Sequence, residues 1–387
     1  MELAVVGAGP TGLTAAREAA KEGVEVLVLE EHHEIGLPVE CAGLLSLRGL
    51  RAIGLRTSGE LVLNTFRGAR FFSPSGHEFV VEAGKPLACV VDRRGLDLAL
   101  AKRAEEAGAR LELGRKVLRV AQLPSGVELQ GPWGRISAEL LIVAEGFRSR
   151  LVRQLGLRTI NWRRVLAASQ VEIRAPGGLH DDFVEVHFAP ELAPGLFAWV
   201  IPLGDGRARV GLACRGLDPR SSLRAFVRRR FGLRLEEAPY SGSVLTCGPI
   251  PKTYARRALV VGDAAGQAKP TTGGGVVLGC LCAREAGRVA AEALSSQDLS
   301  EGLLRTYELA WRGLLGHEFR AMKLVRDLLN AMPPKALDLA FKLASDMDLG
   351  REMPTKVDMD FQSSFLMALP RLLLSGLAKM ATGCRGR

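Results

Sequence analysis

The chain has 387 residues, of which 47% are hydrophobic, and it carries a formal net charge of +10. This length exceeds a single hydrophobic core, so we expect two or three subdomains, and the apolar content is that of a globular protein. The positive charge is densest in "RAFVRRRFGLR" (224–234), which predicts a solvated helix face or, alternatively, a surface for anionic lipid headgroups. No nucleic-acid motif accompanies these arginines, so nucleic acid is excluded as an expected partner.

The first thirty residues, "MELAVVGAGPTGLTAAREAAKEGVEVLVLE", predict a strand, a turn, a helix and a second strand. The first strand runs from Leu3 to Val6, the second covers 24–29 and ends at Glu30, and the turn contains Gly7, Gly9 and Gly12. Such glycines let a pyrophosphate approach the helix N-terminus, and an acid about 20 residues on binds a ribose diol. The pattern predicts a Rossmann-like dinucleotide-binding unit. Because the chain starts on this strand and not on a signal peptide, we expect a cytoplasmic protein.

The stretch "EIGLPVECAGLLS" (34–46) predicts a loop that carries a thiol, Cys41. In a cofactor-binding protein this thiol has three alternative roles: it donates a proton, it shapes a pocket, or it is inert. The chain has seven cysteines without a C-x-x-C pair, and Cys280 and Cys282 stand two apart on an expected helix. We interpret the other cysteines as buried small hydrophobes, and we expect no metal site of the zinc or iron–sulfur type.

Three later stretches extend the nucleotide-binding pattern. "VVDRRGLDLALAKRAEEAGARLELGRKV" predicts an extended segment, an amphipathic helix with Leu96, Leu100 and Ala104 on one stripe, and a strand. A buried strand from Leu140 to Val143 precedes A-E-G (144–146), and another ends in G-D (262–263), followed by a triple-glycine turn that opens a long helix. An acid at a strand end reaches polyol hydroxyls, and such a turn presents backbone N–H groups to a ring oxygen. Together these features predict an FAD site.

The middle of the chain predicts an antiparallel sheet, from short runs rich in Val, Phe and Trp that Gly, Pro and Asp separate. Phe197 and Trp199 lie two apart on one strand, so they share a face and form either a core pair or the walls of an apolar slot. "GDGRARVG" (204–211) predicts a hairpin turn rather than a second dinucleotide fingerprint. We therefore expect electrons from a transiently docked NAD(P)H or from a protein such as ferredoxin.

Beyond Ser300 the chain is predicted to be helical, with a break at Pro333 and Pro334. The segment from Phe361 to Arg387 places apolar residues before a basic tail, and Pro370 interrupts it. A membrane-spanning helix is disfavoured there. The remaining alternatives are a helix packed in the core or in a dimer, and an interfacial helix that lies on a membrane.

Four motifs together resemble the para-hydroxybenzoate-hydroxylase-like FAD superfamily: G-x-G-x-x-G with Glu30, D-R-x-x-L-D (92–97), A-E-G (144–146) and G-D-A-A-G (262–266). Within it, "CAGLLS", "PGLFAWVIP" and "GDAAGQAKPTTGGG" are similar to the geranylgeranyl reductase family, especially its archaeal members that saturate isoprenoid lipids. The resemblance covers residues 1 to about 330.

The resemblance implies an α/β fold, α+β overall, built from a Rossmann-like FAD-binding domain with an inserted antiparallel β-sheet substrate domain and a C-terminal helical region. The FAD-binding domain would comprise 1–66, 85–160 and 245–300. The substrate domain would comprise 67–84 and 161–244, and the helical region 301–387. Such a sheet is expected to roof the reactive face of the flavin.

The same resemblance implies roles for single residues. Glu30 would bind the adenosine ribose, Arg93 the diphosphate or ribitol region, and Asp263 the ribitol. Glu145 stands where A-D-G is commoner and is also an expected cofactor contact, as are the turn residues beneath the flavin pyrimidine, Gly273, Gly274 and Gly275. Phe197 and Trp199 would line the substrate pocket, although Phe197 lacks the hydroxyl of the family's Tyr. Cys41 would lie near flavin and substrate.

The implied activity is an FAD-dependent reductase that saturates C=C bonds of geranylgeranyl chains in isoprenoid lipids, by hydride transfer from reduced flavin. Peripheral contact with the inner face of the membrane is expected for such a substrate. The first alternative is a flavin monooxygenase or halogenase, since "FAWVIP" comes close to the halogenase-type W-x-W-x-I-P and Lys85 is a nearby lysine. The second is a non-catalytic FAD-dependent scaffold or lipid-binding protein.

Overall fold

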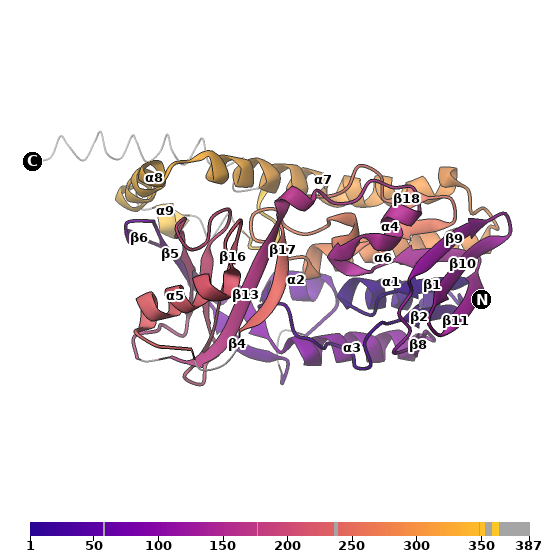
Figure 1. The fold of residues 1–387 in the computed structure, drawn as a ribbon, viewed down its shortest axis with the longest axis horizontal. Helices are drawn as coiled ribbons and strands as arrows, with labels where there is room; N and C mark the ends of the chain where they lie inside the picture. Colours follow the sequence, from indigo (N-terminus) through magenta and orange to yellow (C-terminus); the bar gives the residue numbers. More distant parts are fainter. Residues whose placement is uncertain (57–58, 176, 236–238, 348, 353–357, 364–387) are drawn as a thin grey trace, which may run out of the picture. The chain divides into compact units, whose positions relative to one another are not determined.

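The computed structural model describes residues 1–387 except 57–58, 176, 236–238, 348, 353–357 and 364–387 (Figure 1). The chain divides into two compact units. The first unit comprises 1–39, 93–164 and 245–320, and the second comprises 40–92, 165–244 and 321–387. The predicted domain boundaries stay a prediction, because compactness alone does not define which residues fold as a domain.

The first unit is built on a six-stranded sheet with the order β18-β19-β12-β1-β2-β8. Its central strands are fully buried and parallel, which explains their uninterrupted apolar sequences: β1 (Leu3–Val6), β2 (Val26–Leu29) and β12 (Leu140–Val143). Flanking strands are β8 (Arg110–Glu112), β19 (Ala258–Val260) and the antiparallel β18 (Tyr254–Ala255). The strand predicted at 24–29 begins only at Val26, where its pairing with β1 starts.

Helices α1 (Pro10–Lys21), α3 (Arg93–Glu106) and α6 (Val276–Ser295) belong to this unit. The predicted stripe of Leu96, Leu100 and Ala104 is buried on α3. Small residues let α1 and α6 approach closely, since a Cβ atom built at Gly287 would lie 2.5 Å from the Ala15 carbonyl oxygen. The same helix buries Cys280 and Cys282. A hairpin sheet of β9 (Arg119–Leu123), β10 (Gly126–Gly131) and β11 (Gly134–Ala138), together with α4 (Arg150–Gln154), completes the unit before α7.

The second unit contains a seven-stranded sheet with the order β17-β13-β16-β15-β14-β5-β6. The strands are β5 (Gly68–Phe72), β6 (Glu78–Glu82), β13 (Val165–Arg174), β14 (Phe183–His187), β15 (Ala198–Pro202), β16 (Arg207–Cys214) and β17 (Tyr240–Leu245). The β13, β16, β15 and β14 strands pair antiparallel, and the predicted hairpin joins β15 to β16. Strand β5 instead pairs parallel with β14, and the long stretch of chain between these two strands allows the crossover that a parallel pair requires.

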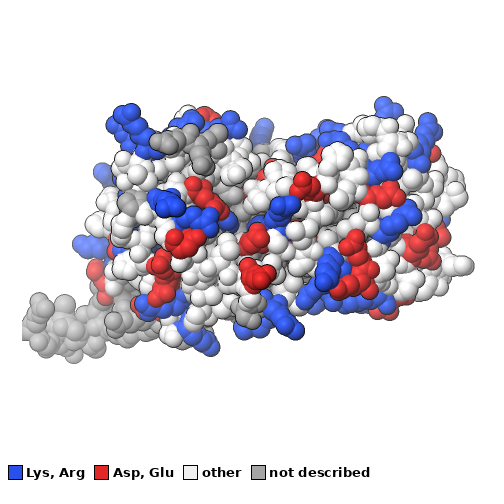
Figure 2. All heavy atoms as spheres, turned by 90° about the horizontal axis from the view of Figure 1, so that it is seen from below, with Lys and Arg blue, Asp and Glu red and all other residues white. Residues whose placement is uncertain are grey.

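Helix α5 (Pro219–Phe231) lies against this sheet (Figure 1). Its Leu223, Phe226 and Val227 are buried, and its Arg224, Arg228 and Arg229 are exposed. The molecular face in Figure 2 shows basic and acidic side chains interspersed. A three-stranded sheet contains β3 (Leu44–Ser46), β7 (Ala88–Val91) and β4 (Val62–Phe66), and α2 (Leu47–Ala52) follows β3.

The C-terminal helices are α7 (Glu301–Ala331), α8 (Pro334–Asp346) and α9 (Leu349–Glu352), so the predicted break at Pro333 and Pro334 is confirmed. Most of the tail predicted from Phe361 to Arg387 lies outside the described residues. Within the described part of the chain, no helix combines the length and the hydropathy that a bilayer crossing requires.

Candidate functional site

The turn between β1 and α1 depends on two of its three glycines for packing. Gly7 has φ +104°, and a Cβ atom built there would lie 2.3 Å from the Ala144 carbonyl oxygen. A Cβ atom at Gly12 would lie 1.9 Å from the Gly7 carbonyl oxygen. At Gly9, by contrast, a Cβ atom would meet no atom within 4 Å. The turn is therefore tight on its inner side and open at Gly9, the N-cap of α1, where free backbone N–H groups attract an anion.

Glu30 closes this turn from the end of β2, as the sequence predicts. Its Oε2 accepts a hydrogen bond from the Ala8 N–H at 2.7 Å. Its Oε1 accepts from the backbone N–H of His32 at 2.9 Å and lies 2.6 Å from the ring Nδ1 of the same residue. A carboxylate offers about four acceptor positions, so Glu30 can still receive a ribose hydroxyl beside the glycine turn.

Asp263 lies in the 3-10 turn η3 (Gly262–Ala265) that follows β19. No described residue donates a hydrogen bond to its carboxylate. Burial raises the pKa of Asp263 to about 6, and the Arg93 cation opposes this shift. Asp263 is partly exposed, so its carboxylate can still accept hydroxyl groups from a ligand such as the ribitol of FAD.

The triple-glycine turn lies directly against Asp263. A Cβ atom built at Gly275 would lie 2.8 Å from Asp263 Oδ1, and one at Gly274 would lie 2.8 Å from Lys269 Cε. Gly273 adopts φ +78° and donates its N–H to the Lys269 carbonyl at 2.7 Å. The backbone conformation therefore favours glycine at Gly273, whereas Gly274 and Gly275 keep the turn close to the Lys269 and Asp263 side chains. Their expected position beneath the flavin stays a prediction.

Gln267 and Tyr307 brace this region, a role that sequence reasoning missed. Gln267 Oε1 accepts from the Gly262 N–H at 2.8 Å, and its Nε2 donates to the Tyr307 hydroxyl at 2.9 Å. That hydroxyl donates to the Val260 carbonyl at 2.9 Å. No local signal reveals this chain of bonds, because Tyr307 lies on α7, forty residues beyond Gln267.

Arg93 and Glu145 both have structural partners. Arg93 Nη2 donates to both carboxylate oxygens of Asp97, at 3.0 and 3.1 Å, one turn along α3. Glu145 Oε1 accepts the N–H groups of Leu151 and Val152 at 2.7 and 3.0 Å and so caps α4, while burial raises its pKa. The cofactor contacts expected for both residues stay predictions, and the cap is the role that the structure adds.

The loop of Cys41 lies in the second unit and is held by its own backbone. The Gly43 N–H points at Cys41 Sγ at 3.4 Å, and the Gly43 carbonyl accepts from the Val91 N–H at 3.0 Å. Gly43 adopts φ +73°, a conformation that favours glycine. Cys41 is half-buried, whereas Cys89 in the adjoining β7 is buried with its pKa raised to about 12 by desolvation. The structure thus presents Cys41 from an ordered turn.

Phe197 and Trp199 lie together, as predicted, with ring centroids 6.4 Å apart in an edge-to-face arrangement. The indole lies over Gly211, where a Cβ atom would be 2.4 Å from Trp199 Cζ2. Both rings pack against Leu166, Ala168, Leu196 and Ala213. Two buried polar atoms, Trp199 Nε1 and Gln170 Oε1, have no hydrogen-bond partner among the described residues, and both residues pair with Gly211 across the sheet. The face is therefore apolar apart from these two polar atoms.

Comparisons with known proteins agree with this arrangement. Residues 1–220 match the family described as "FAD binding domain". Digeranylgeranylglycerophospholipid reductase 2 of Methanothermobacter thermautotrophicus is 36% identical over 360 residues, which cover 90% of this chain and 92% of that protein. The structure of a geranylgeranyl bacteriochlorophyll reductase-like protein from Thermoplasma acidophilum has a TM-score of 0.82 at 27% identity and covers 89% of this chain and 91% of its own.

A p-nitrophenol 4-monooxygenase from Pseudomonas putida shares the fold alone. Its TM-score is 0.70 at 18% identity, over 97% of this chain and 99% of its own. The expected α/β fold with an FAD-binding domain is confirmed by these comparisons, and so is FAD as the cofactor.

Proposed function

We propose that this chain, which belongs to the digeranylgeranylglycerophospholipid reductase family and binds FAD, saturates C=C bonds of geranylgeranyl chains in archaeal-type isoprenoid lipids. The protein is thus an FAD-dependent oxidoreductase of the class that acts on CH–CH groups. The observation that carries this conclusion is the 36% identity that extends over 90% of the chain. Three features of the first unit fit FAD: the open N-terminus of α1, the Glu30 carboxylate, and the Asp263 carboxylate, which accepts no hydrogen bond from the described residues.

When bound and reduced, FAD supplies a hydride. An isolated alkene is a poor hydride acceptor, so the protein must hold the chain in place and keep water away. We assign the apolar face of Phe197 and Trp199 to the isoprenoid chain, because it combines aromatic rings with small aliphatic neighbours. We assign Cys41 a position beside the reacting alkene, as a proton donor or as a wall of the pocket.

Electrons reach the cofactor, in this proposal, by transient docking of ferredoxin or NAD(P)H. The chain carries one dinucleotide fingerprint, and 204–211 forms the hairpin between β15 and β16. Lys85, the lysine named for the halogenase alternative, is exposed in the structure, and the 36% identity over 90% of the chain is to a reductase. The reductase is therefore favoured over the halogenase.

Contact with a membrane surface is supported by exposed leucines on two successive helices. On α7, the side chains of Leu324 and Leu328 are 68% and 60% exposed. On α8, those of Leu339 and Leu343 are 58% and 41% exposed, next to the exposed Lys342. Residues four apart share one helix face, and leucines beside lysines suit an anionic bilayer surface. We place the protein in the cytoplasm, at the inner face of the membrane.

The test is mass spectrometry of lipids from a host that makes unsaturated archaeal-type lipids and expresses this chain. The proposal expects a gain of two hydrogen atoms for every reduced double bond. A gain of oxygen or halogen atoms would instead support the monooxygenase or halogenase. Unchanged lipids from cells that contain the FAD-loaded protein would contradict the proposal.

A further inference from the structure

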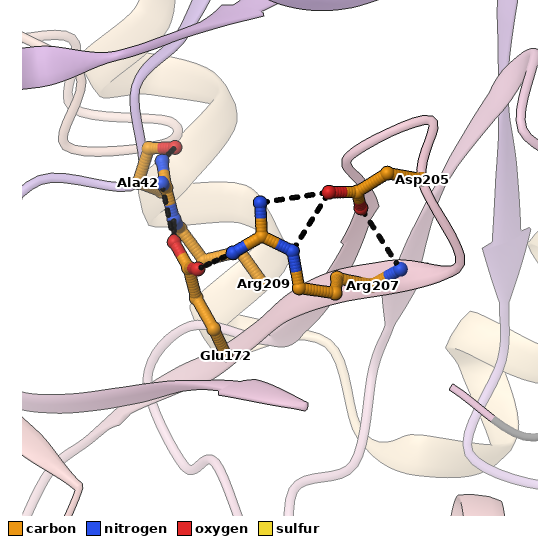
Figure 3. A network of polar contacts seen from close by, with 5 residues as sticks. All are labelled: Ala42, Glu172, Asp205, Arg207 and Arg209. Carbon is orange, nitrogen blue, oxygen red and sulfur yellow. Dashed lines mark hydrogen bonds and ion pairs between the residues drawn. The ribbon is translucent and has the colours of Figure 1, made fainter. Parts of the chain in front are cut away.

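Arg209 is a buried arginine in the middle of the second unit. It lies on β16, and only 6% of its surface is exposed. Its Nη1 donates to the Ala42 carbonyl at 2.7 Å, and its Nε and Nη2 donate to Glu172 Oε1 at 3.1 and 2.6 Å (Figure 3). A buried guanidinium is costly unless its charge and its donors are satisfied. The bonds to Glu172 and to the Ala42 carbonyl are therefore what makes the burial of Arg209 tolerable.

Glu172 supplies the opposite charge from the neighbouring strand. It stands directly across from Arg209 in the pairing of β13 with β16. Its second oxygen, Oε2, accepts from Arg207 Nη1 at 3.2 Å, and Arg207 is in turn paired with Asp205 (Figure 3). The Glu172 carboxylate thus fixes the plane of the Arg209 guanidinium, and Nη1 is left to donate to the loop that carries Cys41.

The acceptor of the Nη1 hydrogen bond is the carbonyl oxygen of Ala42, the residue directly after Cys41. Gly43 fixes the other side of this turn through its N–H on Cys41 Sγ and its carbonyl on Val91. The Ala42 carbonyl and the Gly43 N–H belong to one planar peptide unit, so rotation of this unit would break the bond to Arg209 and also turn the Gly43 N–H away from Cys41 Sγ. The direction of the thiol is therefore coupled to the guanidinium.

We propose that Arg209 is a positioning residue for Cys41: it clamps the loop so that the thiol faces the reacting alkene. This inference rests on the proposed function, which gives Cys41 its place beside the alkene. Arg209 acts through the loop backbone and does not itself touch the substrate.

The test compares Arg209→Met with Arg207→Met. Methionine keeps much of the length of Arg209 but removes every donor. Arg207 is a matched control, because it bonds to the same Glu172 carboxylate and has no bond to residues 41–43 among the described contacts. The first measurement is the alkylation rate of Cys41 by iodoacetamide, resolved by peptide mass spectrometry. The buried Cys89 reports any loss of the fold in the same molecule.

The clamp predicts that Arg209→Met changes the Cys41 alkylation rate on the order of tenfold, the effect of losing a charge-assisted hydrogen bond. Cys89 stays unreactive, and Arg207→Met behaves as wild type. Equal Cys41 rates in both variants would overturn the proposal. If Arg209→Met makes Cys89 reactive, the milder variant Glu172→Gln is measured in its place. A changed alkylation rate of Cys41 in that variant supports the clamp, and an unchanged rate overturns it.

The second measurement is lipid reduction at matched FAD content. We expect Arg209→Met to lower kcat more than it raises KM, and Arg209→Lys to restore part of kcat, since lysine can reach one acceptor but not both. If Arg209→Met alters the reactivity of Cys41 but neither wild type nor any variant reduces lipid, the proposed function is contradicted and the coupling of Arg209 to Cys41 is still supported. Normal kcat in Arg209→Met would overturn the clamp and leave the function standing.

Discussion

The Cβ position of Gly12 lies 1.9 Å from the carbonyl oxygen of Gly7, although both glycines belong to one motif with Gly9, whose own Cβ position is open. Backbone atoms at that distance cannot move aside cheaply, so Gly12 is needed where α1 packs against the Gly7 turn and Ala144. Gly9 instead keeps the space in front of the α1 N-terminus free of a side chain. The three glycines therefore have separable roles.

Substitutions at these glycines should separate folding from cofactor binding. Gly12→Ala should destabilise the protein by about 1–3 kcal/mol or more through overpacking. Gly9→Val should leave the unfolding temperature of the apoprotein near that of wild type but abolish the yellow colour, because its side chain fills the path of the pyrophosphate. Thermal unfolding and FAD release on denaturation measure the two effects. Full FAD content in Gly9→Val would contradict the assignment of this turn.

Asp263 should make FAD binding depend on pH. Its raised pKa, about 6 against an ordinary 3.8, means that the folded apoprotein takes up a proton that the unfolded chain does not. The stability that this group contributes is present below pH 3.8 and is lost as the pH rises through about 6. Above that window, Asp263→Asn apoprotein should be more stable than wild type, by up to about 3 kcal/mol.

FAD affinity should show the opposite trend in the wild type. Ribitol hydroxyls donate best to an ionised carboxylate, so the affinity should fall as the pH drops below about 6. Asp263→Asn should bind FAD weakly at every pH. Fluorescence titration of FAD measures both proteins, and Asp298→Asn, an exposed carboxylate of the same unit, is the control. A flat wild-type profile would show that Asp263 does not contact the cofactor.

Cys41→Ser should retain FAD and lose lipid reduction. Serine has nearly the volume of cysteine but is far less acidic, so a proton-transfer role would cost on the order of 10²-fold or more. A role in pocket shape alone should cost much less. The measurement is anaerobic reoxidation of dithionite-reduced enzyme by lipid. Cys214→Ser is the control, because a serine hydroxyl can still donate to the Leu217 carbonyl. Unchanged rates in Cys41→Ser would make this thiol inert.

Charge placed on the exposed leucines should weaken membrane binding. The double variant Leu324→Glu with Leu328→Glu should float less with anionic vesicles, while its stability stays near wild type because both side chains are largely exposed. Leu98→Glu, on α3 of the first unit, is the matched control for an exposed leucine. Binding should also decrease with salt. Equal flotation of wild type with neutral and anionic lipid would contradict an electrostatic contribution.

Local patterns determined much of this protein from sequence alone. The glycine spacing with Glu30, the apolar runs of β1 and β12, the stripe on α3 and the break at Pro333 each depend on neighbours within a few turns. Such features follow from backbone geometry and periodicity, so they can be predicted without knowing what packs against them. The motifs were sufficient to predict FAD as well.

Tertiary structure alone decided which distant side chains meet. Arg209 has the sequence signature of an ordinary charge after a hairpin, yet it is buried and bonded to Ala42, 167 residues away. Gln267 and Tyr307 meet across 40 residues, and the parallel pairing of β5 with β14 joins strands that no turn connects. The cost of burying a charge or a donor is satisfied by whichever partner the fold brings near, and no local pattern specifies that partner.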